Sequence, residues 1–343
     1  MHTDPDKDVR LEAIDSMLHL YIPADDSGPL HTMFNRVKST VVQTDPPVVS
    51  PDVQVDASAK EALAQTLQKD FNDEVRVAAA RALYSLKATD QLPVLLATLD
   101  DPRNAGYPDV RIAVIRTLGF MRDPTTGPSL EKTLHDSNKA IVAEGATAIG
   151  LVGDKGAREP LENLFRATPD RMGADHTIRR NSLEALSLLR DPGSAALFES
   201  LLASPDDYYR EVSAEGLARL KHDPKILKDR YDQEKKDNVH NALAYGLAAS
   251  GQNDYINVLA NALDSRQDYQ VEAYLYELGK FDGGLTELYR YLRSSNPRVR
   301  AKMVRVIGNI GDPSSRDQVQ ALTTDSNIEV AREAVAALRK LSS

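Results

Sequence analysis

The sequence predicts an all-α protein built as an α-solenoid of about ten short helical repeats. Three observations support this fold class: an apolar pattern recurs about every 31 residues, Asp or Asn precedes most recurrences, and Gly or Asp-Pro closes many of them. A period of this length accommodates two helices and two turns. Because a solenoid adds core one unit at a time, a chain of 343 residues need not divide into two domains. We therefore expect a single array over residues 1–343.

The repeat is measured from an apolar residue near the start of the second helix, which we call position zero. Another apolar residue follows at position eight, and a small residue comes next. The residues at position zero are Val9, Val75, Val110, Ile141, Ile178, Tyr209, Val239, Gln270, Val299 and Val330. The intervals are 29 to 37 residues, apart from a first interval of 66. This regularity indicates a true repeat.

Local chemistry agrees with the period. Three residues before position zero stand side chains that accept hydrogen bonds from the free N–H groups of a first helical turn. These predicted N-caps are Asp6, Asn72, Asn138, Asp175, Asp206, Asn296 and Asn327. Glycine after position eight would let a neighbouring helix approach closely, at Gly119, Gly150, Gly279 and Gly308. Predicted stop signals end repeats at 122–124, 153–155, 190–192, 222–224 and 311–313.

Departures from the period predict insertions. The long first interval contains a Pro-rich insertion, residues 21–57, after an incomplete first repeat in which residues 4–20 resemble a second helix without its partner. We expect this insertion to fold back over the array, and a disordered linker is the alternative. Two shorter insertions, 101–108 and 168–176, should protrude as loops between paired helices.

The Asx-x-x-Val-Arg start, the Ala-rich second helix, the Leu/Ile-Gly end and the Gly-Asp-Pro turn together resemble HEAT repeats. They are similar to the short repeats of phycocyanobilin lyase subunits, the PBS-lyase-like type, over residues 4–20 and 58–341. The resemblance implies a right-handed superhelix whose second helices line the concave surface. It also implies kinship with many bacterial scaffolds that have no assigned chemistry.

Composition argues against several chemistries. The chain has no Cys, which excludes a thiol nucleophile and a zinc–thiolate site. No His is followed by Glu, so the His-Glu dyads that hold a di-iron centre in the related deoxyhypusine hydroxylases are absent. We expect no catalytic residue, cofactor or metal. A net charge of -9 and the lack of Trp argue against a nucleic-acid partner.

No apolar run is long enough to span a bilayer. We expect a soluble protein, either cytoplasmic or exported after loss of an upstream signal.

Arginine recurs at position one, directly after the residue at position zero. The ladder consists of Arg10, Arg76, Arg111, Arg179, Arg210 and Arg300. A basic ladder could bind phosphate or carboxylate groups. We favour a structural role, in which each Arg reaches a turn Asp of the adjacent repeat through an exposed ion pair that contributes about 0–1 kcal/mol.

Position six lies between the buried stripes and should face the groove. Along the array it changes from basic to acidic to aromatic, and we predict that a partner binds there. The predicted contact residues are Tyr245, Tyr274, Tyr276 and Arg305, with His240, Glu215, Glu184, Arg116 and Arg81. Exposed aromatic residues are enriched at binding hot spots. The alternative is that the tyrosines fill gaps between repeats.

The sequence therefore predicts a non-catalytic scaffold that binds an unidentified protein or peptide on its concave surface. The alternative is a subunit of an enzyme, such as a phycobilin lyase-type chromophore lyase or isomerase.

Overall fold

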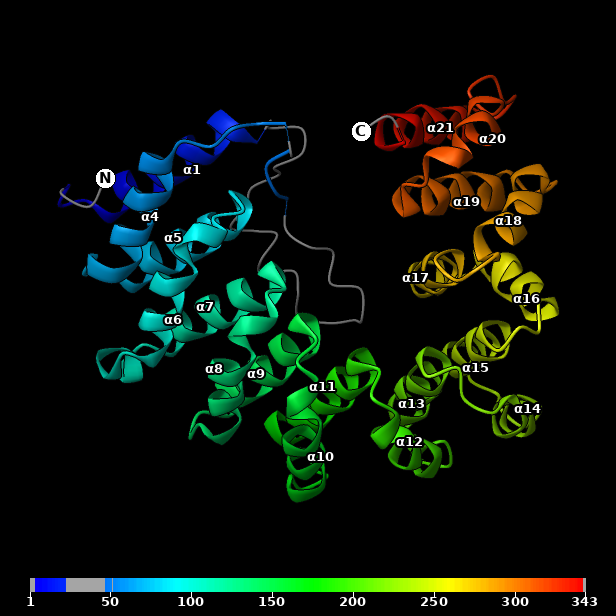
Figure 1. The fold of residues 1–343 in the computed structure, drawn as a ribbon, viewed down its shortest axis with the longest axis horizontal. Coiled ribbons are helices and arrows are strands. Elements are labelled where there is room, and N and C mark those ends of the chain that lie inside the picture. Colours follow the sequence, from blue (N-terminus) through cyan, green and yellow to red (C-terminus); the bar gives the residue numbers. More distant parts are fainter. Residues whose placement is uncertain (1–3, 23–46, 51, 342–343) are drawn as a thin grey trace. The chain divides into compact units, whose positions relative to one another are not determined.

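The computed structural model describes residues 4–22, 47–50 and 52–341. These residues contain helices and no strand, and they form two compact units, Met1–Asp191 and Pro192–Ser343. In each unit, pairs of antiparallel helices stack so that second helices lie on one face and first helices on the other (Figure 1). The predicted α-solenoid fold is confirmed. The hand of the superhelix stays a prediction.

Among the described residues, the first unit consists of one second helix followed by four helix pairs. Its second helices are α1 (Lys7–Tyr21), α5 (Asp73–Ser85), α7 (Pro108–Met121), α9 (Lys139–Val152) and α11 (Ala174–Leu189). Its first helices are α4 (Ala57–Lys69), α6 (Leu92–Asp100), α8 (Gly127–Lys132) and α10 (Arg158–Ala167). Short 3-10 helices precede or extend several of them: η1 (Thr89–Gln91), η2 (Pro102–Gly106), η3 (Pro124–Thr126), η4 (Thr133–His135) and η5 (Lys155–Ala157).

The second unit repeats the pattern. Its second helices are α13 (Asp207–Arg219), α15 (Asp237–Ala249), α17 (Asp268–Gly279), α19 (Pro297–Ile310) and α21 (Ile328–Lys340). Its first helices are α12 (Ala195–Leu201), α14 (Pro224–Tyr231), α16 (Asp254–Ala262), α18 (Gly284–Leu288) and α20 (Arg316–Gln320). The 3-10 helices here are η6 (Pro192–Ser194), η7 (Tyr289–Arg293) and η8 (Pro313–Ser315).

Six of the seven predicted N-caps are confirmed by hydrogen bonds. In each case the side chain accepts from a backbone N–H two or three residues later, at Asp6, Asn72, Asn138, Asp206, Asn296 and Asn327. The prediction for Asp175 is wrong, because α11 already begins at Ala174. Gly173 precedes it with φ 99°, a conformation that lets the preceding loop enter the helix early. Asp175 instead pairs with Lys139 at 2.6 Å.

Close packing of second helices depends on glycine, as expected. A Cβ atom on Gly150 would lie 2.7 Å from the Cα atom of Ala185 on α11, and one on Gly308 would lie 2.5 Å from the Cβ atom of Ala337 on α21. Any larger residue would push the neighbouring helix away. The small residues thus set the spacing along the second-helix face.

The stop signals combine two devices. Arg122, Gly153, Arg190 and Gly311 all have φ between 52° and 76°, the left-handed conformation that ends a helix. The Asp that follows three of them then accepts a backbone N–H two residues later and so caps the next 3-10 helix, at Asp123, Asp154 and Asp312. One dipeptide therefore ends one repeat and begins the next.

Part of the proline-rich insertion contacts the array. The Val49 N–H donates to the Ser85 carbonyl at 2.8 Å, and Val48 packs against the paired rings of Tyr84 and Phe120. This segment thus lies over the C-terminal ends of α5 and α7, in agreement with the expected fold-back. The prediction for the remainder lies outside the described residues, at 23–46 and 51.

Position-one arginines tie consecutive repeats together, as predicted. Arg10 donates from Nε to Asp70 at 2.9 Å and from Nη2 at 3.1 Å, which links α1 to the turn before α5. The equivalent links are Arg76 with Asn104, Arg111 with Asp136, Arg210 with Glu234, and Arg300 with Asp325. Arg179 differs, since it donates to the carbonyl groups of Phe165 and Thr168 in its own repeat.

One expectation about this ladder is wrong. The pairs were expected to be exposed, yet the side chains of Arg10 and Asp70 are 0% exposed. The Asp70 carboxylate also accepts the Asn72 N–H at 2.9 Å, so it fixes its own turn while it binds the arginine of the preceding repeat.

The carboxylate that pairs with Arg210 is also shaped by its surroundings. At Glu234 burial alone would raise the pKa, but hydrogen bonds from Arg210 and from two backbone N–H groups lower the Glu234 pKa to about 2.

Asp70→Asn tests whether this buried link holds α1 in place. The change leaves the Arg10 charge buried without its counter-ion, which costs about 3 kcal/mol. We expect amide hydrogen exchange in α1 to become about 100-fold faster, measured by mass spectrometry on peptides from Lys7–Tyr21.

The matched control is Asp100→Asn, which removes an exposed pair with Lys132 at 3.3 Å. In this control variant, amide hydrogen exchange in α1 should change by only a few-fold, because exposed ion pairs contribute about 0–1 kcal/mol. Equal exchange in the two variants would contradict a structural role for the buried pair.

Candidate partner-binding surface

A groove of about 850 Å³ crosses the second-helix face of the first unit, over α1, α5 and α7. Its floor is apolar and is made largely by position two of three successive repeats: Leu11, Val77 and Ile112. These side chains are only half-buried, whereas Ile14 and Leu18, which line the groove from α1, are buried. The groove thus offers an accessible apolar strip that runs across three helices.

Charged residues border this strip. Position minus one, in the first turn of each helix, is acidic in the same three repeats, at Asp8, Glu74 and Asp109, and all three are exposed. Arg81 and Arg116 also line the groove. Burial and the nearby Arg116 lower the pKa of Arg81. In total, six carboxylates and two guanidinium groups line the groove, so its rim is acidic.

Three of the predicted contact residues, Tyr245, Tyr274 and Glu215, prove to be interior, and Glu215 is 3% exposed. Tyr245 is 0% exposed and Tyr274 is 2% exposed, and their rings stack with centroids 4.6 Å apart. The prediction that these rings present a contact surface is therefore wrong. The alternative, that they fill the space between repeats, is correct for this pair, because α15 carries small residues here and its neighbours close over it.

Both phenol groups belong to a buried polar network. Tyr274 Oη donates to Glu215 Oε1 at 2.6 Å, and Tyr245 Oη donates to Glu277 Oε2 at 3.0 Å. Arg219 lies between the two carboxylates and donates to Glu277 at 2.8 Å and to Glu215 at 3.2 Å. Burial opposes the arginine charge, but the two carboxylates outweigh it and raise the Arg219 pKa.

This network links helices that are not neighbours. Glu215 and Arg219 lie on α13, whereas Tyr274 and Glu277 lie on α17, two repeats further on. In a typical solenoid each repeat contacts only the next one. The second-helix face is therefore closed over α15 by charged and aromatic side chains. Burial, followed by the nearby Glu215, raises the Tyr274 pKa well above its ordinary value.

The other predicted residues lie apart from this pair. Tyr276 is half-buried beneath Lys280, whose ammonium is 4.0 Å from the ring centroid. The His240 ring stacks on the Tyr231 ring at the end of α14, with ring centroids 3.9 Å apart, and it does not line the groove over α1, α5 and α7. Burial lowers the pKa of His240. Glu184 is half-buried on α11.

Position-six arginines form inter-repeat pairs. Arg116 donates from Nε to Glu144 at 2.9 Å, and Arg305 pairs with Glu333, in each case a Glu at position three of the following repeat. Arg305 also approaches Glu272 at 3.5 Å. The hydrogen bond with Glu333 raises the Arg305 pKa, although burial opposes this. These side chains line the second-helix face, and their charges are already matched.

The residues at positions minus one and two, and not those at position six, indicate the open groove in the sequence. Position two is apolar in α1, α5 and α7, at Leu11, Val77 and Ile112, whereas it is polar in α13 and α15, at Glu211 and Asn241. A comparison of positions minus one and two across the repeats would have located the acidic rim and apolar floor.

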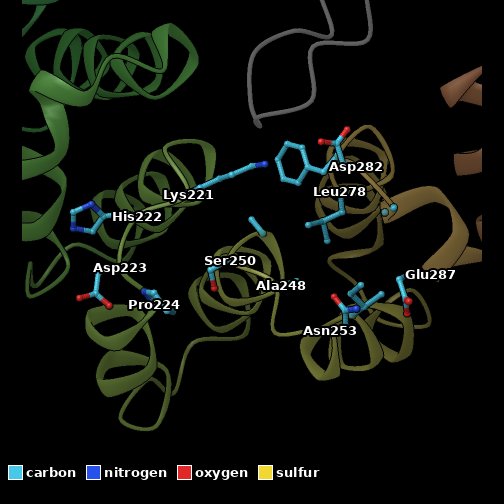
Figure 2. A pocket seen from close by; sticks show the side chains of 16 residues that line it. Lys221, His222, Asp223, Pro224, Ala248, Ser250, Asn253, Leu278, Asp282 and Glu287 are labelled. Atoms are coloured by element: carbon cyan, nitrogen blue, oxygen red, sulfur yellow. The ribbon is translucent and has the colours of Figure 1, made fainter.

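A second hollow, of about 580 Å³, lies in the second unit where the turns after α13, α15 and α17 stack (Figure 2). Lys221 extends across it towards Phe281, with its ammonium 4.6 Å from the ring centroid. Asp223 caps α14 by accepting the Lys225 N–H at 2.9 Å. Polar groups that line this hollow, such as the Asp223 carboxylate, already form hydrogen bonds that shape the turns. We therefore assign no ligand to it.

The described residues contain no group of three or more His, Asp or Glu side chains placed to hold a metal ion. His222 pairs with Glu199 at 2.7 Å, and Asp136 pairs with Arg111 at 2.6 Å. His222 and Asp136, which belong to the His-Asp dipeptides of the turns at 222–223 and 135–136, thus pair outside their own dipeptides.

Comparison with known protein families identifies the repeats. A model of HEAT repeats matches residues 103–174 and 285–343, and a model of the PBS lyase HEAT-like repeat matches residues 75–101. These matches show HEAT-type repeats at those residues, including one of the PBS-lyase-like type, in agreement with the stacked helix pairs. No curated protein matches the chain significantly.

Several solved structures are similar to the chain at low sequence identity. The complex of CpcE and CpcF of phycocyanin lyase from Nostoc sp. PCC7120 matches with a TM-score of 0.52 and 17% identity, over 79% of this chain and 100% of that chain. An engineered protein matches with a TM-score of 0.40 and 18% identity, over 99% and 97%. Human deoxyhypusine hydroxylase matches with a TM-score of 0.34 and 18% identity, over 83% and 96%. At 17% identity, the likeness to the CpcE and CpcF complex shows a shared fold alone.

Within the described part of the chain, no helix has both the length and the apolar character needed to cross a membrane.

Tyr274→Phe tests the interior role of the tyrosine pair. The change removes the phenol that donates to Glu215 and leaves a buried carboxylate short of a donor, which costs about 1–3 kcal/mol. Urea denaturation should therefore show a lower midpoint. Tyr269→Phe, at a residue that is 70% exposed, is the control and should shift stability by less than about 0.5 kcal/mol. Equal midpoints for the two variants would contradict the interior role.

Proposed function

We propose that the protein is a non-catalytic scaffold that binds a protein or peptide partner on its second-helix face. The observation that carries the proposal is the groove over α1, α5 and α7, whose apolar strip remains accessible. Surface apolar residues that line up across adjacent repeats are costly in water unless a partner covers them. The extended faces of stacked helical repeats serve as binding surfaces.

We place the partner site in the first unit, and not at the tyrosines of the second unit. Leu11, Val77 and Ile112 are half-buried, whereas Tyr245 and Tyr274 lie in the interior. The arginines of the groove, Arg81 and Arg116, remain part of the proposed site. We also propose that both units form one array, since the interval from Ile178 to Tyr209 is 31 residues, like most others.

A comparative pull-down from the source organism tests this proposal. The groove variant carries Val77→Arg and Ile112→Arg, which place bulky charges on the apolar strip. The control carries Glu61→Arg and Glu159→Arg at exposed positions of the first helices α4 and α10. A partner recovered by the wild type and the control, and lost with the groove variant, supports the proposal. If every captured protein is recovered equally by all three, the proposal fails.

The alternative function is that of a subunit of a chromophore lyase. The PBS-lyase-like repeat and the fold shared with phycocyanin lyase favour it, although neither supplies a site. An absorbance titration of the full chain with a free bilin separates the two functions. We expect no saturable change in the bilin spectrum. A stoichiometric spectral shift would favour the lyase subunit instead.

A further inference from the structure

We propose that the groove over α1, α5 and α7 takes a cationic amphipathic helix as its occupant. This inference rests on the proposed scaffold function and adds the chemical class of the partner. It is carried by two features that occur together in three consecutive repeats: an apolar residue at position two and an acidic residue at position minus one.

The floor fits the apolar face of a helix. Leu11, Val77 and Ile112 occur once per second helix, and packed helices lie about 8–10 Å apart. The strip is therefore roughly 20 Å long, which is the length of about 13 helical residues. A helix with apolar residues at i, i+3, i+4 and i+7 can cover such a strip along its length. The buried Ser85 hydroxyl also lines the groove and has no hydrogen-bond partner among the described residues.

The rim selects positive charge. Asp8, Glu74 and Asp109 are exposed beside the floor, and carboxylates outnumber arginines in the groove. Glu74 already pairs with Lys7 at 2.9 Å, so Asp8 and Asp109 carry most of the attraction for a cationic partner. All three acidic residues also lie in first helical turns, where the helix dipole favours them, so charge alone does not define the site. The apolar strip beside them supplies the second requirement. An acidic helix would meet the rim with like charge, and nucleic acid would be repelled in the same way.

Direct binding of designed peptides tests the inference. The probe is a fluorescein-labelled peptide of about 18 residues, with Leu at helical spacing and Lys elsewhere. One comparison peptide has Glu in place of every Lys. Another has the Lys–Leu composition in a scrambled order that removes the apolar face. Fluorescence anisotropy with the full chain should give binding of the probe at least about tenfold tighter than of either comparison peptide.

Matched variants locate the binding. The groove variant is Asp8→Asn with Glu74→Gln and Asp109→Asn, all at exposed residues whose neutral forms keep the side-chain shape. It should weaken probe binding about tenfold at low salt, through loss of charge complementarity. The control is Glu61→Gln with Asp100→Asn and Glu159→Gln, which removes the same charge from first helices and should leave the dissociation constant unchanged.

Three outcomes overturn the inference: equal binding of the scrambled peptide, equal binding of the acidic peptide, or equal weakening by both triple variants. The last would indicate attraction to net negative charge only. None of these results bears on the scaffold function, because a partner of different chemistry could still be lost from the pull-down when Val77 and Ile112 are changed. Thermal melts of each triple variant exclude unfolding as the cause of lost binding.

Discussion

The bond between an arginine at position one and an acceptor in the following turn is the interaction on which the stacking of repeats depends. Arg10 with Asp70, Arg111 with Asp136, and Arg300 with Asp325 share one geometry, in which a carboxylate also accepts a backbone N–H two residues later. Each carboxylate thus shapes one turn and receives the preceding repeat. Apolar packing of the stripes supplies most of the burial, but it is non-directional. The ion pairs fix which turn meets which helix.

The two units use their second-helix faces differently. In the first unit, position two is apolar in α1, α5 and α7, and the second-helix face stays open over these three helices. In the second unit, Glu211 occupies position two of α13, and Tyr245 and Tyr274 fill the space over α15. The same backbone therefore presents an accessible strip in one place and a sealed polar interior in another. The side chains at a few repeat positions decide between them.

The period, the caps and the stops could be predicted because each depends on residues close together in sequence. Asn72 and Asn296 cap helices by bonding within three residues, and the left-handed Arg122 and Gly311 end helices locally. The site could not be predicted in the same way. Whether Tyr245 is exposed depends on side chains from α17, which a single repeat does not contain. Asp175 failed as a cap for a related reason, since a loop insertion moved the helix start.

The contacts between α13 and α17 also have a mechanical consequence. In a solenoid held only by contacts between neighbouring repeats, each interface between repeats can bend independently of the others. Contacts among Arg219, Glu277 and the tyrosine pair bridge both the α13–α15 and the α15–α17 interfaces. Neither interface can therefore open while these contacts persist. Under tension, the segment from α13 to α17 should therefore deform as one unit, whereas interfaces that lack such a bridge should deform more easily.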